Sequence, residues 1–158
     1  MAAIEWSRLS SGMFEDMVAC LLSHQNPEIQ RIDGSGGDGG RDCQFDGPDG
    51  LHAYEMKGFP GGRVGKVQRR QVVRSLKKAA LLKPVDWTLI TPVDQTPAEK
   101  KWFDALRNTV PFPIVWRGKT WLDLEFAQRP FIAGYYLGTT SDEVVELLFG
   151  EFRASDRP

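Results

Sequence analysis

The chain has 158 residues, a length typical of one domain that can bury a hydrophobic core. Its residues are 41% hydrophobic and 26% charged, and its apolar runs are short, so no membrane-spanning segment is expected. The net charge of −1 argues against a protein that simply coats nucleic acid. The first residues lack the features of a signal peptide, and there are only two cysteines, so we expect a cytoplasmic protein with reduced thiols.

An amphipathic helix is predicted near the N-terminus, over residues 11–23. Apolar residues recur there at steps of three and four, and either Ser10 or Ser11 can cap the first turn. Cys20 lies in this apolar stripe, so we expect its thiol to be buried. Pro27 follows soon after the expected end of the helix.

A glycine-rich loop and a hairpin follow the helix. A short extended segment, residues 29–33, leads into residues 34–40, which contain too many glycines for a helix or a strand. Strands are predicted over residues 41–45 and 51–57, because the five residues between them have the composition of a tight turn. Cys43 lies on the first of these strands and is expected to be buried.

The second half of the chain alternates helices with strands, which favours a mixed sheet flanked by helices. A basic helix is predicted over residues 64–82 and ends before Pro84. The remaining predicted elements are a strand over 87–91, a helix over 97–108 capped by Thr96, a strand over 112–116, a helix over 121–126, and a helix over 142–152 capped by Ser141.

Two carboxylates are predicted to face each other across the hairpin. If its strands pair antiparallel about a centre between Pro48 and Asp49, Asp42 lies opposite Glu55. Side chains alternate between the faces of a strand, so Lys57 shares the face of Glu55. The opposite face carries residues suited to burial, namely Cys43, Phe45, Tyr54 and Met56.

Opposed carboxylates repel each other, so this pairing is poor for stability alone. A bound divalent cation removes the objection, because Mg²⁺ prefers hard oxygen ligands. Held by Asp42 and Glu55, such a cation would polarise a phosphodiester and lower the pKa of a bound water, while Lys57 would orient that water or stabilise the transition state. The alternative is a solvated polar face with a cross-strand pair of lysine and carboxylate.

Positive charge is concentrated directly after the second strand. Residues 56–85 contain nine basic residues and no acidic residue, whereas exposed helices normally mix both signs. One interpretation is that these cations simply form a solvated face. The other is that they contact the phosphates of a nucleic acid, and such contacts favour non-specific or shape-dependent binding. The candidates for phosphate contacts are Arg63, Lys66, Arg69, Arg70 and Arg74.

The glycine loop and the hairpin resemble the Mrr-like branch of the PD-(D/E)XK restriction-endonuclease superfamily. The stretch Phe14-Glu15-Asp16-Met17-Val18 is similar to a family stretch whose glutamate points toward the metal site. The other matching segments are Gly36-Gly37-Asp38-Gly39-Gly40-Arg41-Asp42 and Tyr54-Glu55-Met56-Lys57.

The resemblance implies an α/β fold with the superfamily's αβββαβ core, a central mixed sheet flanked by helices. One domain is expected over residues 1–158, with a core at about 10–92 and a C-terminal α/β extension at about 93–152. The implied catalytic residues are Asp42, Glu55, Lys57 and Glu15, with Asp42 and Glu55 as ligands of Mg²⁺, for which Mn²⁺ can substitute. Either Gln68 or Gln71 matches a polar position on the following helix.

The implied activity is hydrolysis of phosphodiester bonds in duplex DNA by an endonuclease. Residues 87–92 and 96–106 also resemble nuclease domains at the N-terminus of bacterial antiviral NTPases. This favours an effector of an anti-phage or restriction system, with a fused or associated NTPase or sensor module and a homodimer or higher oligomer. Two alternatives stay open: a resolvase-like nuclease selective for Holliday junctions, and a non-catalytic DNA-binding or assembly module of the same fold.

Other chemistries find little support in the sequence. The glycine loop lacks the lysine-containing ending of a phosphate-binding loop, and His24 and His52 lack partners at metal-binding spacing. Asp38 either stabilises the loop or contacts a water near the metal. The spacing of the large aromatic residues is that of a core and not of a base-stacking platform, for Trp87, Trp102, Phe103, Phe112, Trp116 and Trp121.

Overall fold

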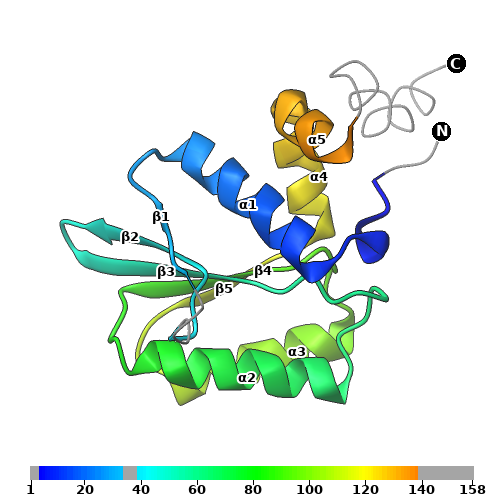
Figure 1. Cartoon of the computed structure of the whole chain (residues 1–158). Helices are drawn as coiled ribbons and strands as arrows, with labels where there is room; N and C mark the ends of the chain where they lie inside the picture. Colours follow the sequence, from blue (N-terminus) through cyan, green and yellow to red (C-terminus); the bar gives the residue numbers. More distant parts are fainter. Residues whose placement is uncertain (1–3, 34–38, 139–158) are drawn as a thin grey trace, which may run out of the picture.

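The computed structural model describes residues 4–33 and 39–138, which form a five-stranded sheet with helices on both faces (Figure 1). The helices are α1 (Ser11–Gln25), α2 (Lys66–Ala80), α3 (Pro97–Leu106), α4 (Lys119–Gln128) and α5 (Pro130–Leu137), with 3₁₀ turns η1 (Trp6–Arg8) and η3 (Arg107–Thr109). The strands are β1 (Gln30–Arg31), β2 (Cys43–Gly47), β3 (Gly50–Met56), β4 (Asp86–Ile90) and β5 (Ile114–Arg117). Of the helices just named, none is long and apolar enough to cross a membrane.

The strands lie in the sheet in their chain order, from β1 to β5. The pairs β1–β2 and β2–β3 are antiparallel, and the pairs β3–β4 and β4–β5 are parallel. The order α1-β1-β2-β3-α2-β4 is the αβββαβ arrangement expected from the sequence. The predicted fold class, a mixed sheet flanked by helices, is therefore confirmed.

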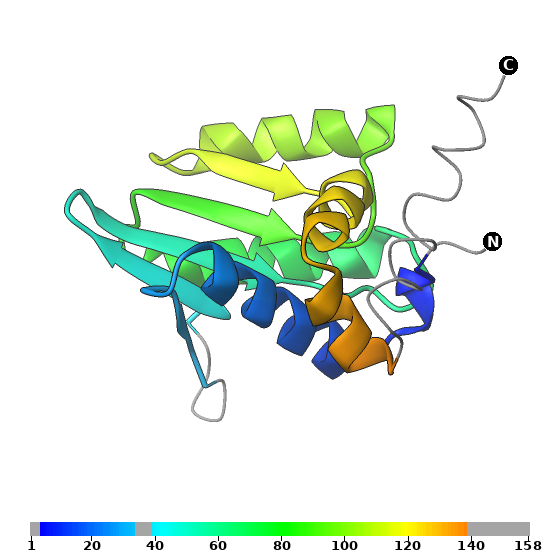
Figure 2. The same cartoon turned by 90° about the horizontal axis from the view of Figure 1, so that it is seen from above.

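Two hydrophobic cores lie on the two faces of the sheet. Helices α1, α4 and α5 cover one face, and α2 and α3 cover the other (Figures 1 and 2). Burial alternates along β4, because Leu89 packs in the core of α2 and α3, whereas Ile90 packs in the core of α1. Strand β4 is thus packed on both sides.

The predicted helix caps are largely as expected. The Ser10 hydroxyl accepts a hydrogen bond from the Met13 N–H at 3.1 Å, and Thr96 forms a capping box with Glu99. The sequence did not predict α5, which contains a glycine and three aromatic residues and is a weak helix former by composition. Burial of Ile132 and Ala133 in the core of α1 stabilises it instead. The predicted helix over 142–152 and its Ser141 cap lie outside the described residues.

The two cysteines differ in burial. Cys43 is completely buried, as predicted, and burial raises the pKa of its thiol to about 11. Cys20 is exposed, so the prediction of its burial is wrong. A helix turns by about 100° per residue, and the side of α1 that carries Phe14, Val18 and Leu21 faces the sheet. Position 20 therefore points away from it.

The end of the glycine loop packs directly against α2. Gly40 has φ of +79°, and a Cβ there would lie 2.0 Å from the Ser75 carbonyl oxygen and 2.6 Å from the Ala79 nitrogen. The Trp87 indole N–H donates a buried hydrogen bond of 3.0 Å to the Gly40 carbonyl. Asp42, the first candidate metal ligand, follows two residues later. The packing of Gly40 therefore fixes the position of the backbone that leads to Asp42.

We predict that Gly40→Ala lowers the free energy of unfolding by about 2 kcal/mol or more, since it adds both a steric clash and an unfavourable φ. Urea unfolding measures the change. Gly12→Ala in α1 is the matched control, because a Cβ at that position meets nothing within 4 Å. Alanine also favours a helix more than glycine does, so this variant should not lose stability. Equal stability of the Gly40→Ala and wild-type proteins would contradict the packing described.

Candidate active site at the open end of the hairpin

The hairpin has the predicted antiparallel register. Cys43 pairs with Tyr54 at the open end of the ladder, and Asp42 precedes Cys43 by one position. The Asp42 N–H donates to the Tyr54 carbonyl at 2.7 Å, so the backbone of Asp42 is still bonded to β3 just before Glu55. The strands run over 43–47 and 50–56 and are shifted slightly from the predicted limits. Lys57 directly follows β3, so all three candidate residues lie at the open end of the hairpin.

The buried face of the hairpin is also as expected. Cys43 and Met56 are completely buried in the core of α1, and Phe45 and Tyr54 are half-buried against it. At the turn end, His52 hydrogen-bonds Asp49 and Asp86, and its pKa is raised chiefly by the bond with Asp49. The histidine thus ties the turn to β4 and is not a part of the candidate site.

Asp42 is held by backbone groups on both sides. The Met56 N–H donates to its Oδ2 at 2.7 Å, and its carbonyl accepts from the Ile32 N–H at 2.8 Å. The carboxylate therefore lies against the peptide that joins Glu55 to Met56. Its orientation is set by the sheet, and does not depend on a flexible side-chain partner.

Glu55 and Lys57 form an ion pair along β3. The Glu55 Oε1 lies 3.0 Å from the Lys57 Nζ, and the Glu55 side chain is only 1% exposed, against 24% for Lys57. Burying a carboxylate is costly unless a cation compensates it, and Lys57 supplies one. The alternative of a solvated polar face does not describe Glu55, and the lysine pairs along the strand and not across it.

Glu15 approaches the same place from α1. Its pKa is raised, first by burial and then by the negative charge of Asp42, while the charges of Arg31 and Lys57 lower it. The Arg31 guanidinium lies 4.0 Å from the Glu15 carboxylate. The structure therefore brings Glu15 within electrostatic range of two of the three hairpin residues, Asp42 and Lys57.

Thr91 is a residue of the site that the sequence did not indicate. Met56 pairs with Ile90 in the parallel ladder, and the Lys57 N–H donates to the Ile90 carbonyl at 3.0 Å, so the next position beside Lys57 is Thr91. Thr91 is completely buried, and its hydroxyl has no hydrogen-bond partner within the described part of the chain. Only the pairing of β3 with β4, which is distant in sequence, reveals this neighbour.

The donor chemistry fits a magnesium-type cation. Over residues 4–33 and 39–138, no group of three or more His, Cys, Asp and Glu side chains is arranged to hold a metal ion. Mg²⁺ does not require one, because proteins commonly hold it by one or two carboxylates with waters completing the shell. Asp42 and Glu55 supply hard oxygen atoms at one end of the hairpin. Asp38 lies outside the described residues.

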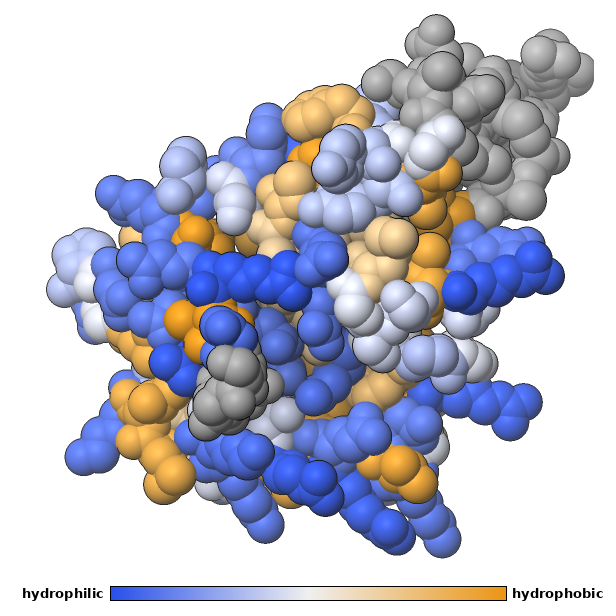
Figure 3. Space-filling model, in the orientation of Figure 1, coloured by the Kyte–Doolittle hydropathy of each residue, from blue (hydrophilic) through white to orange (hydrophobic). Residues whose placement is uncertain are grey.

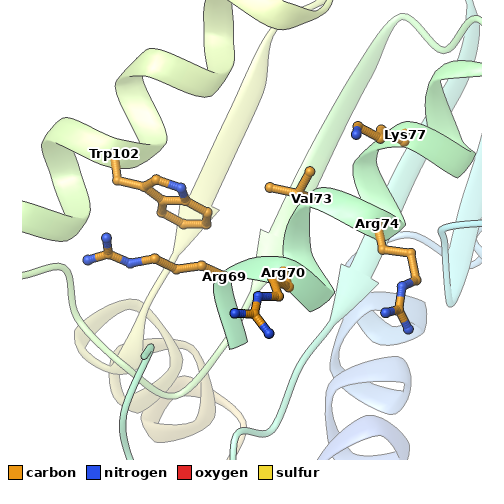
Figure 4. Close-up of a pocket in the computed structure, with 6 residues that line it drawn as sticks. All are labelled: Arg69, Arg70, Val73, Arg74, Lys77 and Trp102. Atoms are coloured by element: carbon orange, nitrogen blue, oxygen red, sulfur yellow. The ribbon is translucent and has the colours of Figure 1, made fainter. Parts of the chain in front are cut away.

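The predicted phosphate-binding residues divide into two groups. Arg63 is exposed in the loop before α2, and Lys66 is exposed at the first position of this helix. The others line one open pocket together with Lys77, Val73 and Trp102, and of these arginines Arg69 lies beside Trp102 (Figure 4); they are Arg69, Arg70 and Arg74.

Of the two glutamines, one has a structural role. The Gln68 Oε1 accepts a hydrogen bond from the Gly65 N–H at 3.1 Å, so this side chain caps α2. Gln71 is exposed. It lies four residues before Ser75, on the flank of α2 that contacts Gly40, so Gln71 is the better placed of the two relative to the candidate site.

Comparisons of the chain with protein-family models, with curated proteins and with solved structures give no match. The interpretation of the site therefore depends on the geometry and chemistry of its own residues, together with the sequence resemblance described above.

We predict that Thr91→Val leaves the free energy of unfolding unchanged or raises it by about 1 kcal/mol, because it replaces an unsatisfied buried hydroxyl by a methyl group of similar shape. Chemical denaturation tests this, with Thr88→Val at a half-buried position of β4 as control. A loss of stability larger than that of the control would show that the Thr91 hydroxyl has a partner in the folded protein.

Proposed function

We propose that this protein is a metal-dependent DNA endonuclease of the PD-(D/E)XK type, similar to its Mrr-like branch. The observation that carries the proposal is the position of Asp42 at the open end of the hairpin, where it is hydrogen-bonded to the residues on either side of Glu55, with Lys57 3.0 Å from the Glu55 carboxylate. An almost fully buried carboxylate, that of Glu55, and a second acid at the same end of the hairpin are costly in a purely structural sheet. Their placement is understandable where they serve a cation and a phosphate.

Asp42 and Glu55 would hold Mg²⁺, or Mn²⁺ in its place, and the ion when bound supplies Lewis acidity and an activated water. Lys57 brings a positive charge and three N–H donors to the same end of the hairpin, where they orient the attacking water and balance the charge of the phosphate. Glu15 brings a further carboxylate from α1 within electrostatic range of Asp42 and Lys57. In-line attack by water then breaks one phosphodiester bond.

The backbone keeps these groups in place before substrate arrives. The hydrogen bond from the Met56 N–H fixes the direction of the Asp42 carboxylate, and the Gly40 contact with α2 fixes the start of its strand. Preorganised groups cost no rearrangement during the reaction, which is a large part of their catalytic value.

Duplex DNA is the proposed substrate, and a bacterial defence role with a fused or associated NTPase or sensor module is proposed from the sequence resemblance. Dimers of such domains can cut both strands, so a homodimer or higher oligomer is part of this proposal. The resolvase-like and non-catalytic alternatives share the fold, and the cleavage experiment separates them.

We predict that the wild-type protein nicks or linearises supercoiled plasmid with Mg²⁺ or Mn²⁺ but not with EDTA. Asp42→Asn and Lys57→Ala should each lower the rate by about 100-fold or more, since each removes charge stabilisation at the reacting phosphate. Asparagine still accepts the Met56 hydrogen bond, so the fold should persist. Exposed positions provide the controls, Asp46→Asn on β2 and Lys101→Ala on α3, which should cut as the wild type does.

Linear duplex and a four-way junction are then tested with the same variants. Cutting of the junction alone would favour the resolvase-like alternative. If the protein binds DNA equally with and without metal, and cuts none of the three substrates, it is the non-catalytic module and the proposed activity is wrong.

A further inference from the structure

A cationic pocket lies between α2 and α3, on the outer side of the second core. Arg69, Val73 and Lys77 are spaced four residues apart and so line one flank of α2 that faces Trp102 of α3 (Figure 4). Arg70 and Arg74 extend this lining toward solvent, and the pocket encloses about 480 Å³. The space-filling view shows the hydrophilic side chains that gather along the edge where α2 lies (Figure 3).

Within the part of the chain that the structure describes, no acidic side chain pairs with the cations of this pocket, which are Arg69, Arg70, Arg74 and Lys77. The nearby acid of α3, Asp104, is already paired with Lys100 at 2.8 Å and with Arg107 at 3.2 Å. Four like charges around one pocket, with no acidic partner among the described residues, favour an anionic ligand.

Arg69 adds a more specific feature. Its guanidinium lies over the Trp102 ring, with the Cζ atom 5.3 Å from the ring centroid. Its Nε is buried and has no hydrogen-bond acceptor in the described part of the chain. A buried N–H without an acceptor costs about 1–3 kcal/mol, and an oxygen of a bound ligand would remove that cost.

The pocket combines this charge with apolar surface. Val73 and the half-buried Trp102 ring form its apolar part, between the cationic side chains. A phosphate alone would not need the aromatic surface, and an apolar ligand would not need four cations. A nucleotide presents both chemistries, because its base stacks on aromatic rings and guanidinium planes while its phosphate meets cations.

The pocket is separate from the candidate active site. The buried side of α2, with Val72 and Leu76, packs toward the sheet. Another flank of the helix carries Ser75 and contacts Gly40 near the hairpin. None of the three hairpin residues of the candidate site lines the pocket.

We propose that this pocket binds a nucleotide unit, with the base against the Trp102 ring and the Arg69 guanidinium and the phosphates at Arg70, Arg74 and Lys77. The ligand chemistry is an aromatic base beside a phosphate. Its source is either an unpaired segment of a DNA strand or a free nucleotide. The proposal needs no metal and no cleavage, so it stands or falls independently of the proposed nuclease activity.

The test is fluorescence anisotropy in EDTA with a labelled 12-residue oligothymidylate and an abasic strand of the same length. Arg74→Gln should weaken binding of both strands by about threefold or more, since it removes a phosphate contact. Trp102→Ala should lower the affinity for the oligothymidylate by about tenfold and leave the affinity for the abasic strand unchanged, because only bases stack on the ring. Trp102→Phe keeps a ring and should retain most of the affinity, while Lys101→Gln, an exposed charge outside the pocket, should behave as the wild type does.

Competition with ATP in the same buffer identifies the source of the ligand. Displacement of the oligothymidylate at micromolar ATP indicates a free nucleotide, and displacement only by unlabelled strand indicates DNA. The proposal is overturned if the abasic strand binds as tightly as the oligothymidylate, or if Arg74→Gln and Trp102→Ala bind as the wild type does. Circular dichroism confirms that each variant is folded before its affinity is compared.

Discussion

The antiparallel pairing of β2 with β3 is the constraint on which the candidate site depends. Side chains alternate with a period of two, so a slip of one residue would turn Glu55 toward the opposite face and separate it from Asp42. Burial of Cys43 and Met56 in the core of α1 opposes such a slip. His52 further ties the hairpin to β4 through Asp86. The same packing that stabilises the sheet therefore holds Asp42 and Glu55 at the same end of the hairpin.

The surrounding elements extend this constraint to the rest of the site. Gly40 fits against α2 only because it lacks a Cβ, and the Trp87 indole N–H donates to its carbonyl. The backbone just before Asp42 and β2 is therefore held against the helix. From the other face, α1 delivers Glu15, whose pKa responds to Asp42. Helix α2 thereby separates two regions of different chemistry, the hairpin end on one flank and the cationic pocket on the other.

The sequence predicted what depends on local pattern. The turn composition and the alternation of residues 41–57 determine the hairpin register, and the caps at Ser10 and Thr96 determine where helices begin. Features that depend on packing between distant segments were missed. Nothing local places Thr91 beside Lys57, because that contact requires the parallel pairing of β3 with β4. Trp102 was expected in the core, and only the packing of α3 against α2 shows its ring in a pocket. The metal and the DNA remain predictions.

The central claim is that Asp42 and Glu55 together bind a divalent cation. A crystal of the wild-type protein grown with Mn²⁺ and measured near the manganese absorption edge tests it most directly. We predict one anomalous-scattering peak within about 2.5 Å of a carboxylate oxygen of each residue, with Lys57 turned from Glu55 toward the bound water. Absence of a peak at saturating Mn²⁺, with the Glu55–Lys57 pair intact, would show that the carboxylates serve the fold alone and would contradict the account.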